Sequence, residues 1–124
     1  MKTKVPLISL GWKEGKLADL WSFVHFLSGM LLAIILVTYI NLPFIWAFGS
    51  AFFLFLLWEA FELLMRIGEH IPNSVSDIVV GCVGFLYTFY FLPLDDGRLL
   101  ILIIIFILLF DILGMRAYIN RSVL

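Results

Sequence analysis

The chain has 124 residues, of which 64% are hydrophobic and 14% are charged, and its mean hydropathy is +1.14. A soluble domain is typically about 45–50% apolar and about 25% charged, so a small water-soluble fold could not bury this much apolar surface. The sequence has no basic domain, no Gly-rich phosphate loop and no dinucleotide fingerprint, so nucleic acid is not a predicted partner. Cys82 is the only cysteine, which excludes an internal disulfide and a thiolate metal cage.

Four long apolar segments follow one another along the chain and are separated by short polar breaks. Each is long enough to cross ~30 Å of hydrocarbon as a helix that rises ~1.5 Å per residue. A helix also satisfies its own backbone hydrogen bonds in lipid. The sequence therefore predicts a single all-α membrane domain over residues 1–124, an integral four-helix bundle. Its spans are predicted at residues 20–40, 44–67, 75–92 and 99–118.

The breaks carry residues that are typical of helix ends. Asn41 and Pro43 suit the start of the second span, as a cap and a first-turn proline. Gly68 suits the end of the second span. Pro93 stops the third span before the turn at residues 95–97. These signals predict four separate helices that cross the membrane in alternate directions.

The basic residues are distributed unequally between the two sides of the predicted bundle. Arg98 alone belongs to the side that carries the breaks after the first and third spans. The positive-inside rule therefore predicts a multi-pass protein of the cell membrane, the cytoplasmic membrane if the source is bacterial, with both termini in the cytoplasm. The remaining seven of the eight basic residues lie on the cytoplasmic side: Lys2, Lys4, Lys13, Lys16, Arg66, Arg116 and Arg121.

Ionisable residues within the predicted spans are costly and usually face the interior of a bundle, and five of them matter here. With the predicted orientation, all five fall in the cytoplasmic half. The outer half carries almost no charge. We therefore interpret the five as candidates for a functional site: His25, Glu59, Glu62, Asp77 and Asp111.

The second span carries three of the candidate site residues on one helical face. Glu59, Glu62 and Arg66 stand at positions i, i+3 and i+7. If this face looks into the bundle, its two carboxylates meet His25 and Asp111. Such a cluster could bind a metal ion, carry a proton or hold a cationic headgroup. The predicted ligand-binding cluster is His25, Glu59, Glu62, Arg66, Asp77 and Asp111.

A divalent metal ion is the cofactor that these residue types suit. Carboxylate di-metal bundles use Glu-x-x-His pairs on two helices, whereas this chain has Glu59-x-x-Glu62. The His-Glu-x-x-His zinc motif is also absent from the sequence. The ligand types thus favour a metal but the spacing matches no established signature. The candidate metal ligands are His25, Glu59, Glu62 and Asp111.

Each candidate also has a structural explanation. Ser74 and Asp77 have the spacing of a capping box, so Asp77 could serve only to start the third span. His25 could be a core histidine that bonds a carbonyl or Ser22. Glu59 is the hardest to explain in this way, because it lies deepest and no basic residue lies within one turn of it.

Arg66 and Asp111 also have alternative explanations. Arg66 is at the cytoplasmic interface, where a charged side chain has a small free-energy cost. Contact with solvated headgroups would explain it there. Asp111 could reach Arg116 or the interface itself. The sequence leaves both alternatives open.

Three short motifs resemble the VanZ-like family of small multi-pass membrane proteins, over residues 20–92. That family has an HF pair in one span, E-x-x-Q in the next and D-x-x-x-N-x-x-G opening the one after. The chain departs from the pattern at Glu62, where the family has Gln, at Gly81, where it has Asn, and in lacking an arginine within residues 71–74. The matching segments are His25-Phe26, Glu59-x-x-Glu62 and Ser76-Asp77-x-x-x-Gly81-x-x-Gly84.

The resemblance implies a compact multi-helix protein with an envelope-associated role, since founding members of the family are linked to resistance to a glycopeptide antibiotic. It implies no established chemistry. Membrane lipids are the predicted surroundings, and a second copy or another membrane protein is a candidate partner. Small residues suited to close helix contact, within the chain or between copies, are Gly29, Ala33, Gly81 and Gly84.

Three functions are compatible with these features. The first is a non-enzymatic protein that binds a lipid headgroup, a cation or a partner helix through the cytoplasmic-half cluster. The second is an oligomeric proton or cation conductor, which requires a polar path through the outer half, where the sequence has only Thr38, Ser50 and Thr88. The third is a membrane-embedded enzyme that modifies lipid with metal or acid/base chemistry, although no nucleophile-plus-base pair is evident.

Overall fold

The computed structural model describes residues 20–64 and 71–119, which are helical apart from loops at 40–43 and 92–96. Four helical rods in this part of the chain are long and apolar enough to cross a membrane. This confirms the predicted all-helical class with four candidate spans. The rods are α1 (Leu20–Ala33) continued by the π-helix η1 (Ile34–Tyr39), α2 (Phe44–Leu64), α3 (Ile71–Phe91) and α4 (Gly97–Ile119).

The helix ends agree with the predicted spans except in local detail. Asn41 has a φ of 63°, the left-handed conformation with which asparagine ends a helix, so it terminates η1 rather than capping α2. The Pro43 carbonyl accepts a hydrogen bond from the Ala47 amide at 2.9 Å, which places Pro43 directly before α2. The Asp96 Oδ1 atom accepts a hydrogen bond from the Arg98 amide at 2.9 Å and caps α4.

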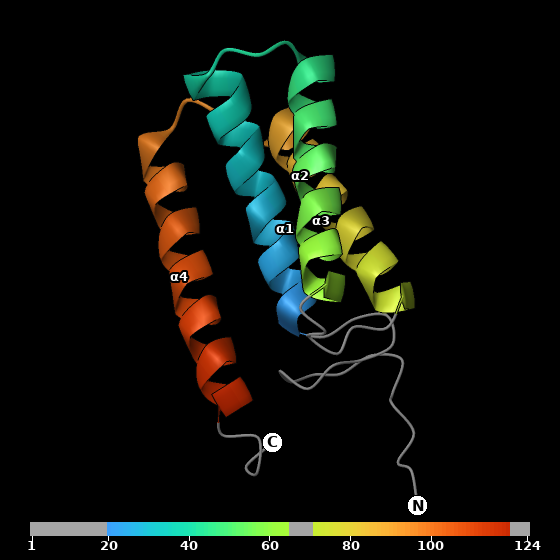
Figure 1. The fold of residues 1–124 in the computed structure, drawn as a ribbon. Coiled ribbons are helices and arrows are strands. Elements are labelled where there is room, and N and C mark those ends of the chain that lie inside the picture. Colours follow the sequence, from blue (N-terminus) through green and yellow to red (C-terminus); the bar gives the residue numbers. More distant parts are fainter. Residues whose placement is uncertain (1–19, 65–70, 120–124) are drawn as a thin grey trace, which may run out of the picture.

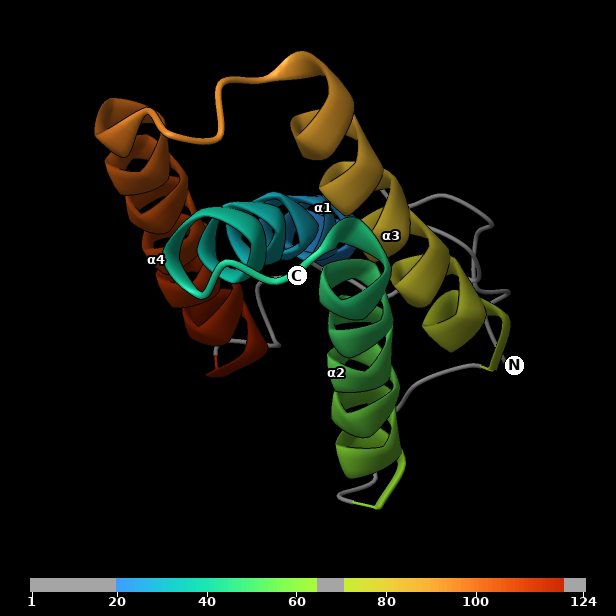
Figure 2. The same cartoon turned by 90° about the horizontal axis from the view of Figure 1, so that it is seen from above.

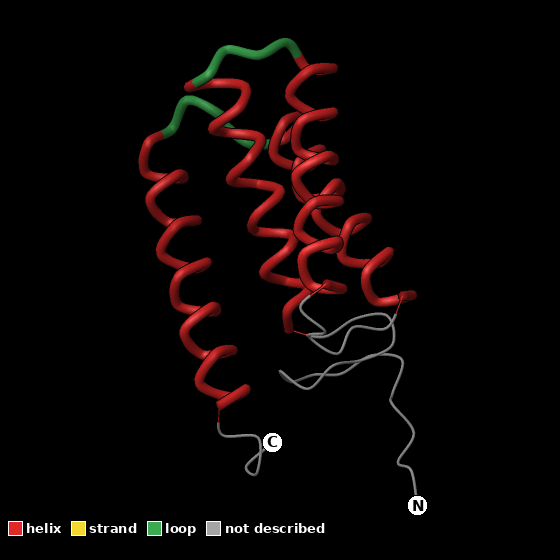
Figure 3. Tube along the Cα trace, viewed as in Figure 1, coloured by secondary structure: helices red, strands yellow, loops and turns green. Residues whose placement is uncertain are grey.

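The helices are arranged around α1. The two described loops lie at one end of the bundle (Figure 3), which we call the loop end. α1 begins and α4 ends at the opposite end (Figure 1), which we call the terminal end. Viewed from above, α1 lies between α4 on one side and α2 and α3 on the other (Figure 2). The contact between α1 and α3 is the most extensive in the bundle.

Glycines bring the backbones of α1 and α3 together. A Cβ atom added at Gly29 would collide with the carbonyl oxygen of Gly81, and one added at Gly84 would collide with the carbonyl oxygen of Phe26. Side chains larger than hydrogen would therefore force the two helices apart. The small residues at these positions serve contacts within the chain.

The half of the bundle nearer the loop end has an apolar core. Of the Thr38, Ser50 and Thr88 side chains in this half, Thr88 donates a hydrogen bond to the Gly84 carbonyl at 2.9 Å and Thr38 donates one to the Leu94 carbonyl at 3.0 Å. The buried side chains of its main cluster are Ala33, Leu36, Ala47, Ala51, Phe55 and Phe85.

Candidate functional site

A cluster of three buried polar side chains lies between α1, α2 and α3. His25 comes from α1, Glu59 from α2 and Asp77 from α3, and their exposed fractions are 8%, 4% and 1%. The His25 Nε2 atom lies 3.3 Å from Glu59 Oε1 and 3.8 Å from Asp77 Oδ2. One ligand atom from each residue lies within 4.8 Å of the other two. We call these residues the His25–Glu59–Asp77 cluster.

The position of the His25 ring is set by its own helix. The Nδ1 atom lies 2.8 Å from the carbonyl oxygen of Trp21, one turn earlier in α1. A carbonyl oxygen only accepts hydrogen bonds, so Nδ1 carries the proton and donates it. In the neutral imidazole the Nε2 atom then presents a lone pair to the two carboxylates. This arrangement favours a cation between Nε2 and the carboxylate oxygens.

The two carboxylates differ in how they are satisfied. Asp77 Oδ1 accepts a hydrogen bond from the Ser22 hydroxyl at 3.3 Å. Both carboxylate oxygens of Glu59 are buried and lack a hydrogen bond within the described part of the chain, although Oε1 faces the His25 Nε2 atom at 3.3 Å. Buried carboxylate oxygens are normally paired, because an unpaired one loses its hydration without replacement. Glu59 is therefore the member of the cluster whose environment most clearly favours binding of a cation.

An aromatic ring closes the cluster toward the loop end. Phe55 stands one turn before Glu59 in α2, and Gly81 stands one turn after Asp77 in α3. A Cβ atom added at Gly81 would overlap the Phe55 ring, so the ring occupies the space above the glycine. A larger side chain at position 81 would fit here only if Phe55 moved.

Glu62 and Asp111, the other two described candidates, lie outside the cluster. Glu62 is 7% exposed and stands one turn beyond Glu59, toward the terminal end. Asp111 is near enough to His25 to interact with it electrostatically. The contact between Phe23 and Phe110, with ring centroids 5.1 Å apart, places Asp111 at about the level of the cluster. Arg66 lies outside the described residues.

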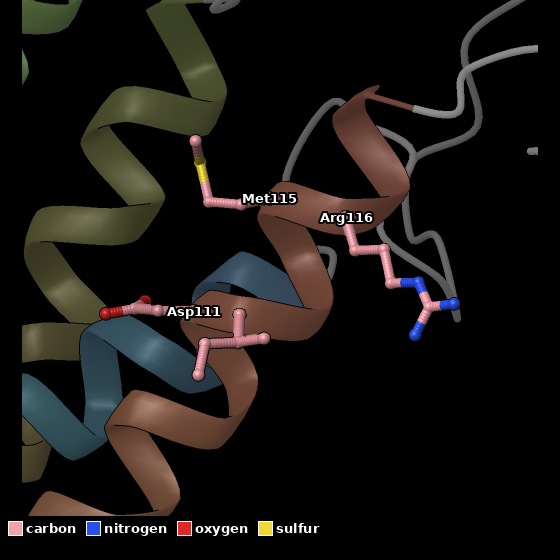
Figure 4. A pocket seen from close by; sticks show the side chains of 4 residues that line it. Asp111, Met115 and Arg116 are labelled. Carbon is pink, nitrogen blue, oxygen red and sulfur yellow. The ribbon is translucent and has the colours of Figure 1, made fainter.

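The surroundings of Asp111 are open. Asp111 and Arg116 line part of a hollow of about 360 Å³ together with Ile112 and Met115. Figure 4 shows the Asp111 carboxylate pointing toward the ribbon of α1 and the Arg116 side chain pointing the other way. The suggested contact between Asp111 and Arg116 is therefore not formed.

Two structural explanations can now be judged. The capping-box interpretation of Asp77 was wrong, because α3 begins at Ile71 and Ser74 lies inside the helix rather than at its cap. The core-histidine interpretation was correct in that His25 bonds a carbonyl, but Ser22 bonds Asp77 instead. The carbonyl bond does not compete with ligand binding, because it leaves Nε2 available.

Sequence reasoning missed the supporting residues of the cluster. Ser22 was considered only as a partner for His25, whereas its hydroxyl orients the Asp77 carboxylate across the α1–α3 contact. Phe55 carried no signal, because one aromatic residue in an apolar span resembles any other. Only the three-residue spacing of Ser22 and His25 hinted that the two share a helical face.

Comparison with known proteins does not assign the chain to a family. No protein-family model, no curated protein and no solved structure matches it. The VanZ-like resemblance stays a prediction from short motifs, so the function has to be argued from the chemistry of the cluster.

Proposed function

We propose that this chain is a multi-pass membrane protein that binds a divalent cation at the His25–Glu59–Asp77 cluster. The observation that carries the proposal is the convergence of one imidazole nitrogen and two carboxylates, buried and within 4.8 Å of one another, from three helices. Imidazole suits zinc and the later first-row metals, and carboxylate suits manganese and magnesium. The mixed set favours a first-row transition metal such as Zn²⁺ or Mn²⁺.

The two distances from the imidazole nitrogen to the carboxylates are near those expected around a single small ion. Ligand atoms that each lie about 2.0–2.2 Å from a tetrahedral metal are about 3.3–3.6 Å from one another. The Nε2–Oε1 and Nε2–Oδ2 separations of 3.3 and 3.8 Å are close to that range. The Trp21 carbonyl supports the same interpretation, because metal-binding histidines usually donate their second ring N–H to a carbonyl or carboxylate.

Charge balance favours a divalent ion over a monovalent one. Two ionised carboxylates and a neutral imidazole carry a charge of −2, which a divalent ion cancels. A buried assembly with net charge is expensive in a membrane span, so neutrality matters here. The deep burial of all three side chains also favours a small ion over a lipid headgroup as the ligand.

The same proposal places the cluster in the cytoplasmic half of the cell membrane, with both termini in the cytoplasm. The unequal distribution of the basic residues supports this orientation. The motifs shared with the VanZ-like family support an envelope-associated role. A cation site in this position would be open to cytoplasmic rather than external ions.

Metal binding is expected to stabilise the protein. With free Zn²⁺ or Mn²⁺ at about 100 times its Kd, the folded state gains ~2.7 kcal/mol, which corresponds to a Tm increase of roughly 10 °C. The measurement is thermal unfolding of the metal-stripped full chain in detergent, before and after each ion is added. His25→Ala should abolish the increase. The proposal is wrong if neither ion raises the Tm of the unmodified chain and none co-purifies with it.

The orientation is tested by cysteine labelling. In a Cys82→Ala background, Asp95→Cys should react with a membrane-impermeant maleimide in intact cells, because Asp95 lies in the exposed loop between α3 and α4. Thr3→Cys should react only after the cells are permeabilised. The reverse pattern would place the cluster in the outer half of the membrane.

A further inference from the structure

The buried polar residues form three pairs, one on each of three helices. Among the described residues seven polar side chains are buried. Thr88 belongs to the loop half and is bonded to its own helix. The other six are spaced three residues apart, which places both members of a pair on one helical face. The pairs are Ser22 and His25 on α1, Glu59 and Glu62 on α2, and Ser74 and Asp77 on α3.

The directions of the helices arrange these pairs in two layers. α1 and α3 run from the terminal end to the loop end, and α2 runs the opposite way (Figure 1). Ser22, Glu62 and Ser74 are therefore the members of their pairs that stand nearer the terminal end. Three residues of helix correspond to about 4.5 Å along its axis. A second layer of three side chains thus lies about one turn from the cluster.

The second layer has a different chemistry from the first. It offers two hydroxyls and one carboxylate, which are oxygen ligands only. Ser74 is 7% exposed, and its buried Oγ atom has no hydrogen-bond partner among the residues that the structure describes. The Ser22 hydroxyl connects the layers through its 3.3 Å bond to Asp77 Oδ1. Oxygen ligands with a single charge bind a divalent ion more weakly than an imidazole with two carboxylates.

The role of the second layer follows from the apolar residues on the side of the cluster toward the loop end. Beyond the cluster toward the loop end lie the Phe55 ring on Gly81 and the apolar core, so the described polar side chains that adjoin the cluster lie on its terminal side. We infer that Ser22, Glu62 and Ser74 form an access layer that binds a divalent cation transiently on its way to the His25–Glu59–Asp77 cluster. The inference rests on the proposed function. An ion leaves the access layer for the cluster because only the two carboxylates of the cluster neutralise its charge.

The access layer is tested by the rate of binding. The full chain in detergent is mixed rapidly with Mn²⁺, and binding is followed by tryptophan fluorescence. Glu62→Gln should lower the association rate constant about tenfold, because a carboxylate that lines an approach concentrates cations there. Asp111→Asn is the matched control, since it removes one carboxylate at a similar depth outside the layer, and its rate constant should stay within about threefold of the unmodified value.

Ser74→Ala distinguishes a local effect of the access layer on the approaching ion from a general effect of charge, because the substitution changes no charge. It should slow association severalfold while the equilibrium Kd for Mn²⁺ stays within about threefold. Equal slowing by Glu62→Gln and Asp111→Asn, or an unchanged rate for Ser74→Ala, would overturn the access layer. If the unmodified chain binds Mn²⁺ normally, such a result leaves the proposed function intact. Failure of the unmodified chain to bind any divalent ion would instead contradict both the proposed function and the access layer.

Discussion

Glu59→Gln is expected to weaken divalent-metal binding by at least about a hundredfold. The substitution removes one charge from a buried assembly that is neutral only with both carboxylates ionised. Losing one partner of a buried charge interaction typically costs ~3–5 kcal/mol, and each 1.4 kcal/mol is about a tenfold change in Kd. Glutamine keeps the length of the side chain, so the effect reports charge and ligation rather than packing. The measurement is the Kd for Zn²⁺ and Mn²⁺ by calorimetry in detergent.

Asp111→Asn provides the comparison for this result. It makes the same change of charge at about the same depth, on a helix that contributes nothing to the cluster. Its Kd should rise by less than about tenfold, because Asp111 acts on the site only through a more distant electrostatic interaction. Unchanged binding in Glu59→Gln would show that the carboxylate is not a ligand. Equal losses in both variants would mean that overall charge, not coordination, determines the affinity.

Gly29→Ala is expected to cause the largest loss of stability of any single-methyl change in the described bundle. The added Cβ would collide with the backbone carbonyl of Gly81, which has no rotamer to move it away. Overpacking of this kind usually costs ~1–3 kcal/mol and sometimes more. We expect a value at or above the upper end, because the whole α1–α3 contact has to open. The measurement is denaturant or thermal unfolding in detergent.

Gly49→Ala is the matched control. Gly49 is also in a helix, but nothing lies within 4 Å of the position that its Cβ would take. Alanine is favoured over glycine in a helix by ~1 kcal/mol, so this variant should be as stable as the unmodified chain or slightly more stable. Equal behaviour of the two variants would contradict the close approach of α1 and α3.

Gly29→Ala also links the fold to the site. Gly81 stands one turn after Asp77, and Gly29 stands one turn after His25. Separating the helices at Gly29 therefore moves the Asp77 carboxylate away from the imidazole. Gly29→Ala should weaken metal binding even at temperatures where it remains folded.

The helices themselves were predictable from local sequence. The predicted spans begin or end within a few residues of α1 with η1, α2, α3 and α4, because apolar length and helix-breaking residues act locally. The exception was the start of α3, where Ser74 and Asp77 were interpreted as a cap. The helix instead begins at Ile71, since Pro72 fits the first turn of a helix and does not end one.

The cluster was only partly predictable. The sequence placed His25, Glu59 and Asp77 in one half of the predicted bundle, but it placed Glu62 and Asp111 there as well. Spacing along one helix favoured Glu59 with Glu62 as neighbouring ligands. In the structure the ligand atoms that meet come from three different helices, a relation that no spacing within one span can express.

The sequence alone therefore determined two properties. These are the predicted four-span architecture and the placement of the ionisable residues of the spans in one half of the bundle. Hydropathy, helix-ending residues and the cost of charge in lipid each act residue by residue, so they can be read without knowing the fold. The tertiary structure decided which carboxylates face the imidazole and which side of the cluster is closed. Those relations depend on how far apart α1 and α3 lie and how Phe55 fills the space at Gly81. Both are set by contacts between residues that are distant in the chain.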